Sequence, residues 1–276
     1  MKKMNRKQAK DENFPVGMLI SPKLKNIVQT YYQAARDADD AADNPLLSAE
    51  QKKAVLDNIE LAFRQPDRPT EFKSAAKLGR LFAAENLDSS LYTDLLTAFR
   101  MDAENQPIEI WEQLLNYCNY SAAPVGRFML AIHNENPSSY LPAATLCAVL
   151  QITNHLQDLK KDAVNLQRFY LPHEMMEQHG ARYSDIYLSF TKPALREVIN
   201  ETTDKLRMML QDAEPIFKIV KNIRLKWELG VIFSLTNSMI KKIERRDVLH
   251  DNIRLNGFDW IKALGSGLNR ILWQKH

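Results

Sequence analysis

Apolar residues recur every three to four positions along nearly the whole chain, and this spacing predicts α-helices. After Pro22, for example, Leu24, Ile27, Val28 and Tyr31 fall on one side of a helix. No segment shows the strict alternation typical of strands, and no internal repeat or low-complexity linker divides the chain. Only eight of the 276 residues are glycine, which disfavours folds that need many tight turns. We therefore expect a single all-α domain.

Prolines and capping residues predict where these helices begin and end. The first should run from Pro22 to about Ala42 and stop before Asn44-Pro45, because a residue that precedes proline disfavours the α region. Ser48 and Gln51 have the spacing of a capping box and predict a helix to about Phe63. Further helices are expected near residues 70–85, 88–104, 108–134, 138–164, 173–178, 183–188, 191–212, 214–242 and 258–273.

Charge and cysteine content exclude several classes of protein. The net charge of +3 is too small to indicate a nucleic-acid partner. Residues 1–12 form a basic tail, which is expected to be a solvated, frayed terminus, with weak attraction to an anionic membrane as the alternative. Cys118 and Cys147 lie in apolar surroundings and are expected to be free thiols of a reducing compartment. Without a secretory signal or a membrane-spanning run, we expect a cytoplasmic protein, with peripheral contact to the inner face of the membrane as a further expectation.

Carboxylates crowd the end of the first predicted helix, at Asp39, Asp40 and Asp43. Asp39 and Asp43 are one turn apart, so their side chains face the same way and repel each other. Negative charge is also unfavourable at a helix C-terminus. A solvated helix face would tolerate this arrangement, whereas a bound cation would stabilise it.

A second polar stripe follows on the helix predicted near residues 138–164. Asn154, Asp158 and Asp162 are spaced four residues apart and share one side of an otherwise apolar segment. Polar groups on a stripe that faces the core need partners or a metal ion. His155 should point away from this stripe. Mg²⁺ prefers oxygen ligands and is often shared between one or two carboxylates and substrate phosphates, so the two clusters together predict a metal-dependent diphosphate site.

Both segments resemble the aspartate-rich signatures of the trans-head-to-head prenyl synthases, the squalene and phytoene synthase family. The first reads from Tyr32 through Arg36 to Asp43, and the second from Leu150 to Asp162, followed by Arg168-Phe-Tyr-Leu-Pro172. Between them, the segment from Tyr117 to Gly126 is similar to the family's central helix. The resemblance covers residues 13–172 and implies an isoprenoid-synthase-type helical bundle around a central apolar cavity, formed by residues 13–276.

The resemblance also implies roles for individual residues. The metal ligands would be Asp39, Asp43, Asp158 and Asp162, holding two or three Mg²⁺ ions, with Asn154 supporting the metal–diphosphate cluster. Tyr117 would lie near the reacting carbons, and Gly126 would be a close-packing position. The residues expected to contact the diphosphate or the substrate are Asn13, Phe14, Tyr32, Arg36, Gln151, Arg168 and Tyr170. For Arg168 and Tyr170, a structural salt bridge and a packing role are equally compatible.

Two departures from the family pattern favour one of its branches. Where members that join two prenyl diphosphates usually carry an arginine before the aspartate, this chain has Gln157. The usual Ser-Phe pair near the N-terminus is replaced by the segment Glu12-Asn13-Phe14-Pro15-Val16. Both changes resemble the bacterial branch that makes hydroxysqualene from presqualene diphosphate by ionisation, rearrangement and capture of water. Tyr117, Asn154 and Gln157 are the candidates to position that water.

The sequence leaves alternatives open about cofactor, product and partners. No dinucleotide fingerprint accompanies Gly265-Ser-Gly267, and the branch implies no NADPH. The alternatives are a synthase that condenses two prenyl diphosphates and a non-catalytic assembly factor, although the four aspartates argue against the latter. Leu229–Leu235 is expected to be core or a membrane-facing exit surface, and contact with other squalene-pathway enzymes is a further expectation.

Overall fold

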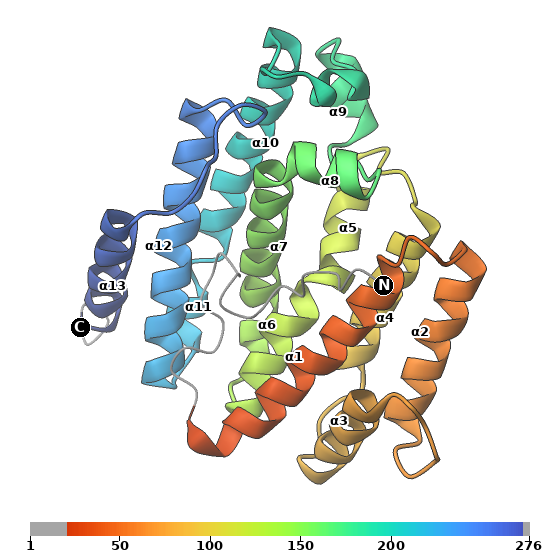
Figure 1. Ribbon diagram of the computed structural model, residues 1–276. Coiled ribbons are helices and arrows are strands. Elements are labelled where there is room, and N and C mark those ends of the chain that lie inside the picture. The colour runs from red at the N-terminus through yellow and green to blue at the C-terminus, as the bar shows by residue number, and fades with distance from the viewer. Residues whose placement is uncertain (1–20, 273–276) are drawn as a thin grey trace.

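The computed structural model describes residues 21–272, with side chains described to Arg270, and this part of the chain is helical without strands (Figure 1). The basic tail and the predicted substrate residues Asn13 and Phe14 lie outside the described residues. The helices are α1 (Pro22–Ala42), α2 (Ala49–Arg64), α3 (Lys73–Ala84), α4 (Ser90–Glu104), α5 (Trp111–Ser121), α6 (Ala123–Ile132), η2 (Pro137–Ser139), α7 (Tyr140–Gln157), α8 (Leu159–Asn165), α9 (His173–Gln178), η3 (Tyr183–Tyr187), α10 (Pro193–Asp212), α11 (Ile216–Ile219), α12 (Ile223–Arg245) and α13 (Gly257–Leu272).

Local signals set the ends of the first two helices as predicted. Helix α1 begins at Pro22, whose fixed φ suits a first helical position, and it ends at Ala42. At the start of α2 the backbone N–H of Gln51 donates to the Ser48 hydroxyl at 3.3 Å, and the Ser48 N–H donates to Gln51 Oε1 at 2.9 Å. The predicted capping box is confirmed.

Three predicted helices are interrupted in the structure. The helix expected at 108–134 breaks at Ala122, because Pro124 lacks the N–H that would continue the hydrogen-bond ladder. The helix expected at 214–242 divides at Asn222, whose side chain caps the start of α12. The helix expected at 138–164 breaks at Asp158, where φ is −95° and ψ is 12°, and this break changes the direction of the second acidic segment.

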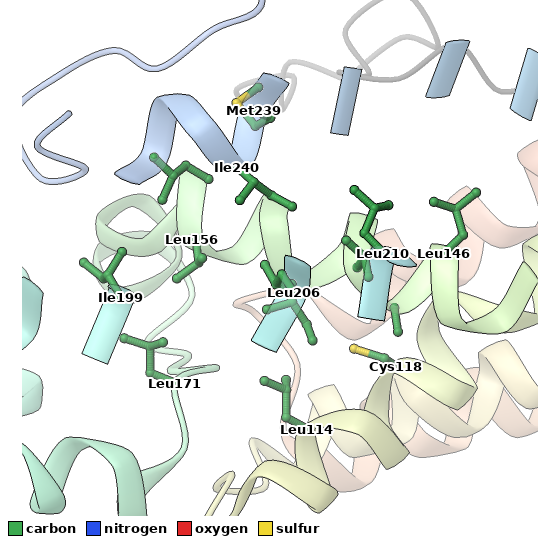
Figure 2. Close-up of a cluster of buried hydrophobic side chains, with 14 of the residues drawn as sticks. Leu114, Cys118, Leu146, Leu156, Leu171, Ile199, Leu206, Leu210, Met239 and Ile240 are labelled. Carbon is green, nitrogen blue, oxygen red and sulfur yellow. The ribbon is translucent and has the colours of Figure 1, made fainter. Parts of the chain in front are cut away.

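Two clusters of buried side chains hold the helices together. The smaller joins α1–α4 and α6 through packed aromatic rings, among which the Tyr31 and Phe128 ring centroids lie 4.0 Å apart. The larger joins α5, α7, α10 and α12, and Figure 2 shows its side chains interlocking around Leu156, Leu206 and Ile240. Leu229–Leu235 is almost entirely buried in α12, as the core interpretation expects.

The two clusters meet where α4 packs on α5 and where α6 packs on α7. The acidic end of α1 comes from the side of the smaller cluster, whereas Asp158 and Asp162 come from α7 and α8 on the side of the larger one. Figure 1 shows α8 lying beside the upper end of α7. Arg168, in the chain that follows α8, donates to Asp43 at the end of α1, so the fold connects the chain beyond the second acidic segment to the first.

Candidate active site

The C-terminal end of α1, from Arg36 to the C-cap residue Asp43, carries one arginine and four carboxylates, those of Asp37, Asp39, Asp40 and Asp43. Arg36 Nη1 donates to Asp39 Oδ2 at 2.7 Å, and Arg36 Nη2 lies 3.4 Å from Asp40 Oδ1. Burial, together with the neighbouring charge of Asp43, raises the pKa of Asp39 to about 6, although Arg36 opposes both effects. This carboxylate is therefore destabilised in its ionised form, as the spacing of the acidic residues predicted.

The second acidic segment lies across the break between α7 and α8. Asp158 occupies the break itself, and Lys161 Nζ lies 3.1 Å from its Oδ2. The Oδ1 atom of Asn154 is buried without a hydrogen-bond partner among residues 21–270. A buried amide oxygen without a partner is unfavourable, so this atom is suited to a ligand that supplies a donor or a cation.

Arg168 lies in the segment that follows α8, and its guanidinium bonds to residues at the ends of both α1 and α4. Gln167 adopts a left-handed backbone conformation, with φ of 54°, which turns the chain back after α8. Arg168 Nη1 then donates to Asp43 Oδ1 at 2.7 Å, and Nη2 donates to the Asp102 carbonyl at 3.1 Å. This buried salt bridge matches the structural alternative for Arg168. A contact with diphosphate stays a prediction.

A buried carboxylate, Asp102, lies at the centre of a polar network that the sequence did not reveal. The Tyr117 hydroxyl donates to Asp102 Oδ2 at 3.1 Å, and the Tyr170 hydroxyl donates to Oδ1 at 3.4 Å. Burial raises the pKa of Asp102 to about 7, although Arg168 and the Tyr117 hydroxyl lower it. In the sequence, Asp102 is a single polar residue near the end of the predicted helix 88–104, with no motif around it. Only its contacts in the folded protein distinguish it from aspartates on the surface.

Beside this network lies a pocket of about 20 Å³, lined by Asp102, Tyr117, Arg168 and Tyr170 among others. Such a volume has room for one water molecule, and the polar side chains around it offer both donors and acceptors. The larger apolar chamber that the resemblance implies stays a prediction.

The prediction that His155 points away from the acidic stripe is wrong. Its ring stacks on Tyr170, with centroids 3.5 Å apart, and its Nδ1 lies 3.7 Å from Asp162 Oδ2. Gln151 Nε2 lies 3.1 Å from His155 Nε2. If the Gln151 amide donates a hydrogen bond to Nε2, the proton of the neutral ring is on Nδ1, which faces Asp162. The break at Asp158 explains the difference, because α8 leaves the axis of α7 and Asp162 no longer continues the straight stripe.

The remaining predicted residues lie around this centre with different neighbours. Gln151 approaches the site through His155, as described. Tyr32 lies half-buried on α1, one turn before Arg36. Gln157 donates from Nε2 to the Ile253 carbonyl at 2.7 Å, so its amide contacts the segment that precedes α13. A role for Gln157 in placing water stays a prediction.

A chain of contacts links the two acidic segments. It runs from Asp43 through Arg168 to Asp102, and from there through Tyr117 and Tyr170 to His155 and Asp162. Two of the predicted ligands, Asp43 and Asp162, are therefore connected through one polar centre, beside which the rings of Tyr117, His155 and Tyr170 lie.

The donor set suits Mg²⁺ shared with a diphosphate better than a site built by the protein alone. Within the described part of the chain, no group of three or more His, Cys, Asp or Glu side chains could hold a metal ion. Each segment offers two carboxylates, and Asn154 adds a buried amide oxygen without a partner. Mg²⁺ is commonly bound by one or two carboxylates while phosphate and water complete its coordination, so these residues fit that role.

Comparisons with known proteins identify the family of this chain. The family model described as squalene/phytoene synthase matches residues 7–258. The hydroxysqualene synthase of Rhodopseudomonas palustris is 35% identical over 260 residues, which cover 93% of this chain and 88% of that protein. The hydroxysqualene synthase of Zymomonas mobilis is 34% identical over 263 residues, which cover 92% and 88% of the two chains. The crystal structure of squalene synthase HpnC from Alicyclobacillus acidocaldarius superposes with a TM-score of 0.74 at 26% identity, covering 83% of this chain and 86% of that one.

The all-helical fold and the family match thus define an all-α enzyme class that acts on prenyl diphosphates. Within that class, this chain belongs to the squalene/phytoene synthase family, because the family model spans nearly its whole length.

Proposed function

We propose that this chain is a hydroxysqualene synthase, which converts presqualene diphosphate and water to hydroxysqualene and diphosphate in a Mg²⁺-dependent reaction. Two observations support the proposal. Contacts link Asp43 through Arg168, and Asp162 through His155, to one polar centre, and the chain is about one third identical to hydroxysqualene synthases over most of its length. Gln157, which stands where condensing members usually have arginine, favours the same branch.

Ionisation breaks the bond between carbon and the diphosphate oxygen, and both electrons leave with the diphosphate. Bound Mg²⁺ would supply positive charge that stabilises the leaving group. Its ligands would be Asp39 and Asp43 on one side and Asp158 and Asp162 on the other, with Asn154 beside them. Arg36 carries a forked cation next to Asp39, and its Nε is buried without a hydrogen-bond partner among the described residues, so we assign it to orient the diphosphate.

The carbocation left behind needs an environment that neither traps it early nor leaves it unstabilised. The rings of Tyr117, His155 and Tyr170 lie within 3.5–6.1 Å of one another and form a continuous aromatic wall. Aromatic faces attract positive charge, so this wall would stabilise the rearranging cation. Because Asp102 holds the hydroxyls of Tyr117 and Tyr170, the rings keep fixed positions.

Water capture ends the reaction: the water oxygen forms a bond to the cation, and the water loses a proton to a nearby base or to the diphosphate. Of the three predicted water-positioning residues, Tyr117 lines the water-sized pocket, which favours it over Asn154 and Gln157. The scheme needs no hydride donor, in agreement with the expectation that NADPH is not required.

Mass spectrometry of the products formed from presqualene diphosphate with Mg²⁺ and without NADPH tests this function. Hydroxysqualene is the expected product, and omission of Mg²⁺ should abolish the release of diphosphate. Squalene or phytoene formed from farnesyl or geranylgeranyl diphosphate alone would instead identify a condensing synthase. A fully folded protein that releases no diphosphate from any of these substrates would indicate a non-catalytic assembly factor. Cytoplasmic location with peripheral membrane contact is part of the same proposal.

A further inference from the structure

Helix α13 has two apolar sides, and only one of them faces the protein. Its inner side packs on α12, where Ala263 is fully buried with Val231 and Leu235. The approach is so close that a Cβ on Gly230 would lie 2.9 Å from the Gly267 Cα. Figure 1 shows α13 at the edge of the bundle beside α12. The orientation of α13 is therefore fixed by tight backbone packing.

The outer side of α13 exposes large apolar side chains to solvent. Phe258 is 75% exposed, Ile261 70% and Leu268 53%, and their spacing of three and seven residues places them on one stripe. Gly265 lies on the same stripe, with no neighbouring atom near the position of a Cβ. Exposed apolar residues are ordinary when scattered, whereas a continuous stripe indicates an interaction surface.

The charges around this stripe are positive. Asp259, the one acidic residue of α13, is buried, and Lys242 Nζ lies 3.0 Å from its carboxylate. Among residues 251–270, the exposed charged residues are Arg254 and Lys262, together with Asp251 at the start of the loop that leads to α13. An apolar stripe flanked by cations is complementary to a bilayer surface that contains anionic lipids.

We infer that the outer face of α13, formed by Phe258, Ile261 and Leu268 with Lys262 beside them, docks this protein on an anionic membrane surface. Within residues 21–272, no helix is long and apolar enough to cross a bilayer, so the contact is one of a helix lying in the interface. The inference rests on the proposed function in one respect. The proposed product, hydroxysqualene, is a long hydrocarbon that partitions into a bilayer, so docking would place the enzyme at the membrane that takes up its product.

A second copy of the chain is a less suitable occupant of this face. Three side chains present roughly 300–500 Å², whereas a stable dimer buries about 800 Å² on each partner. The stripe is also narrow, which suits insertion between lipid headgroups.

Flotation of the purified full chain with phosphatidylcholine vesicles, with and without phosphatidylglycerol, tests the inference in the absence of substrate. We expect binding to the anionic vesicles that weakens at high salt. The double variant Phe258→Ser/Ile261→Ser should reduce the vesicle partition coefficient at least about tenfold. Lys262→Glu should reduce it only on anionic vesicles. The matched control Leu46→Ser removes an 88% exposed leucine from another surface and should bind like the unaltered chain.

Several outcomes would overturn the inference. The first is that the protein does not bind anionic vesicles at low salt. The second is that Leu46→Ser and the double variant lose vesicle binding equally. The third is that sedimentation shows a concentration-dependent dimer, which the double variant abolishes. Activity in detergent is measured separately and should be the same in the double variant and the unaltered chain. Vesicle binding without hydroxysqualene formation would contradict the proposed function alone, and activity without vesicle binding would contradict the docking surface alone.

Discussion

At the scale of single residues, Asp39 combines a cost in stability with a proposed role in catalysis. It is partly buried and lies one turn from Asp43, so its charge is unfavourable without a cation. We expect Asp39→Asn to lower the Mg²⁺-dependent rate of diphosphate release at least about a hundredfold, because it removes a charged metal ligand. The thermal midpoint of the metal-free protein should be unchanged or higher.

The matched control for this variant is Asp40→Asn, which makes the same change on the same turn of α1 at a position that is not a predicted ligand. It should change the rate less than about tenfold. Equal losses in the two variants would contradict a specific metal role for Asp39.

His155 offers a second prediction at this scale. It faces Asp162 and is held by Gln151 and by stacking on Tyr170, so we expect it to orient Asp162 for metal binding. His155→Phe keeps a ring for stacking but loses the polar contacts, and it should raise the Mg²⁺ concentration for half-maximal activity about tenfold. A titration of activity against Mg²⁺ measures this. His179→Phe breaks a contact with Glu201, which is not a predicted ligand, and should leave the Mg²⁺ requirement unaltered.

The buried carboxyl of Asp102 should make stability depend on pH. Its pKa of about 7 in the folded protein lies above its ordinary value, so the stability it confers is complete below about pH 4 and is lost as the pH rises through 7. Between pH 5 and 8 this loss is on the order of 2 kcal/mol. Denaturant unfolding at both pH values should show a smaller difference for Asp102→Asn than for the unaltered chain. An identical difference would mean that Asp102 ionises at the same pH in the folded and unfolded chains.

At the scale of elements, the contact between α6 and α7 depends on a glycine. A Cβ added to Gly126 would lie 2.6 Å from Cys147 Sγ, which bears out the sequence-based expectation of close packing. Gly126→Ala should therefore reduce the free energy of unfolding by about 1–3 kcal/mol, because α6 and α7 or the thiol must move. Gly265→Ala is the control: it lies in α13 with open space around it, and alanine there should stabilise the protein by about 0.5–1 kcal/mol. Equal effects would show that the contact is not tight.

The breaks between helices also shape the site at this scale. The capping box of α2 and the start of α1 follow from residues within one turn, which is why the sequence predicts them. The break at Asp158 has no proline or glycine to announce it, and it moves Asp162 into contact with His155. A straight-helix interpretation of Asn154, Asp158 and Asp162 therefore gave the wrong direction for His155.

At the scale of the whole molecule, the site joins two core clusters that pack separately. The proposed ligands on α1 belong to one side and those on α7 and α8 to the other, so a bridging ligand should stabilise the molecule as a unit. We expect Mg²⁺ and diphosphate together, at about a hundred times their dissociation constant, to raise the thermal midpoint by about 5 °C. Either component alone should raise it less. The double variant Asp39→Asn/Asp158→Asn should lose the shift, and an undiminished shift in that variant would place the binding elsewhere.

The sequence by itself determined the helical class, the main helix ends and the two acidic segments, because all of these depend on residues a few positions apart in the chain. Only the tertiary structure decided that Arg168 pairs with Asp43, that Asp102 holds two tyrosines, and that α13 keeps an apolar side open to solvent. These features depend on which helices approach each other and at what angle. That choice is made by the packing of distant side chains, which no local pattern encodes.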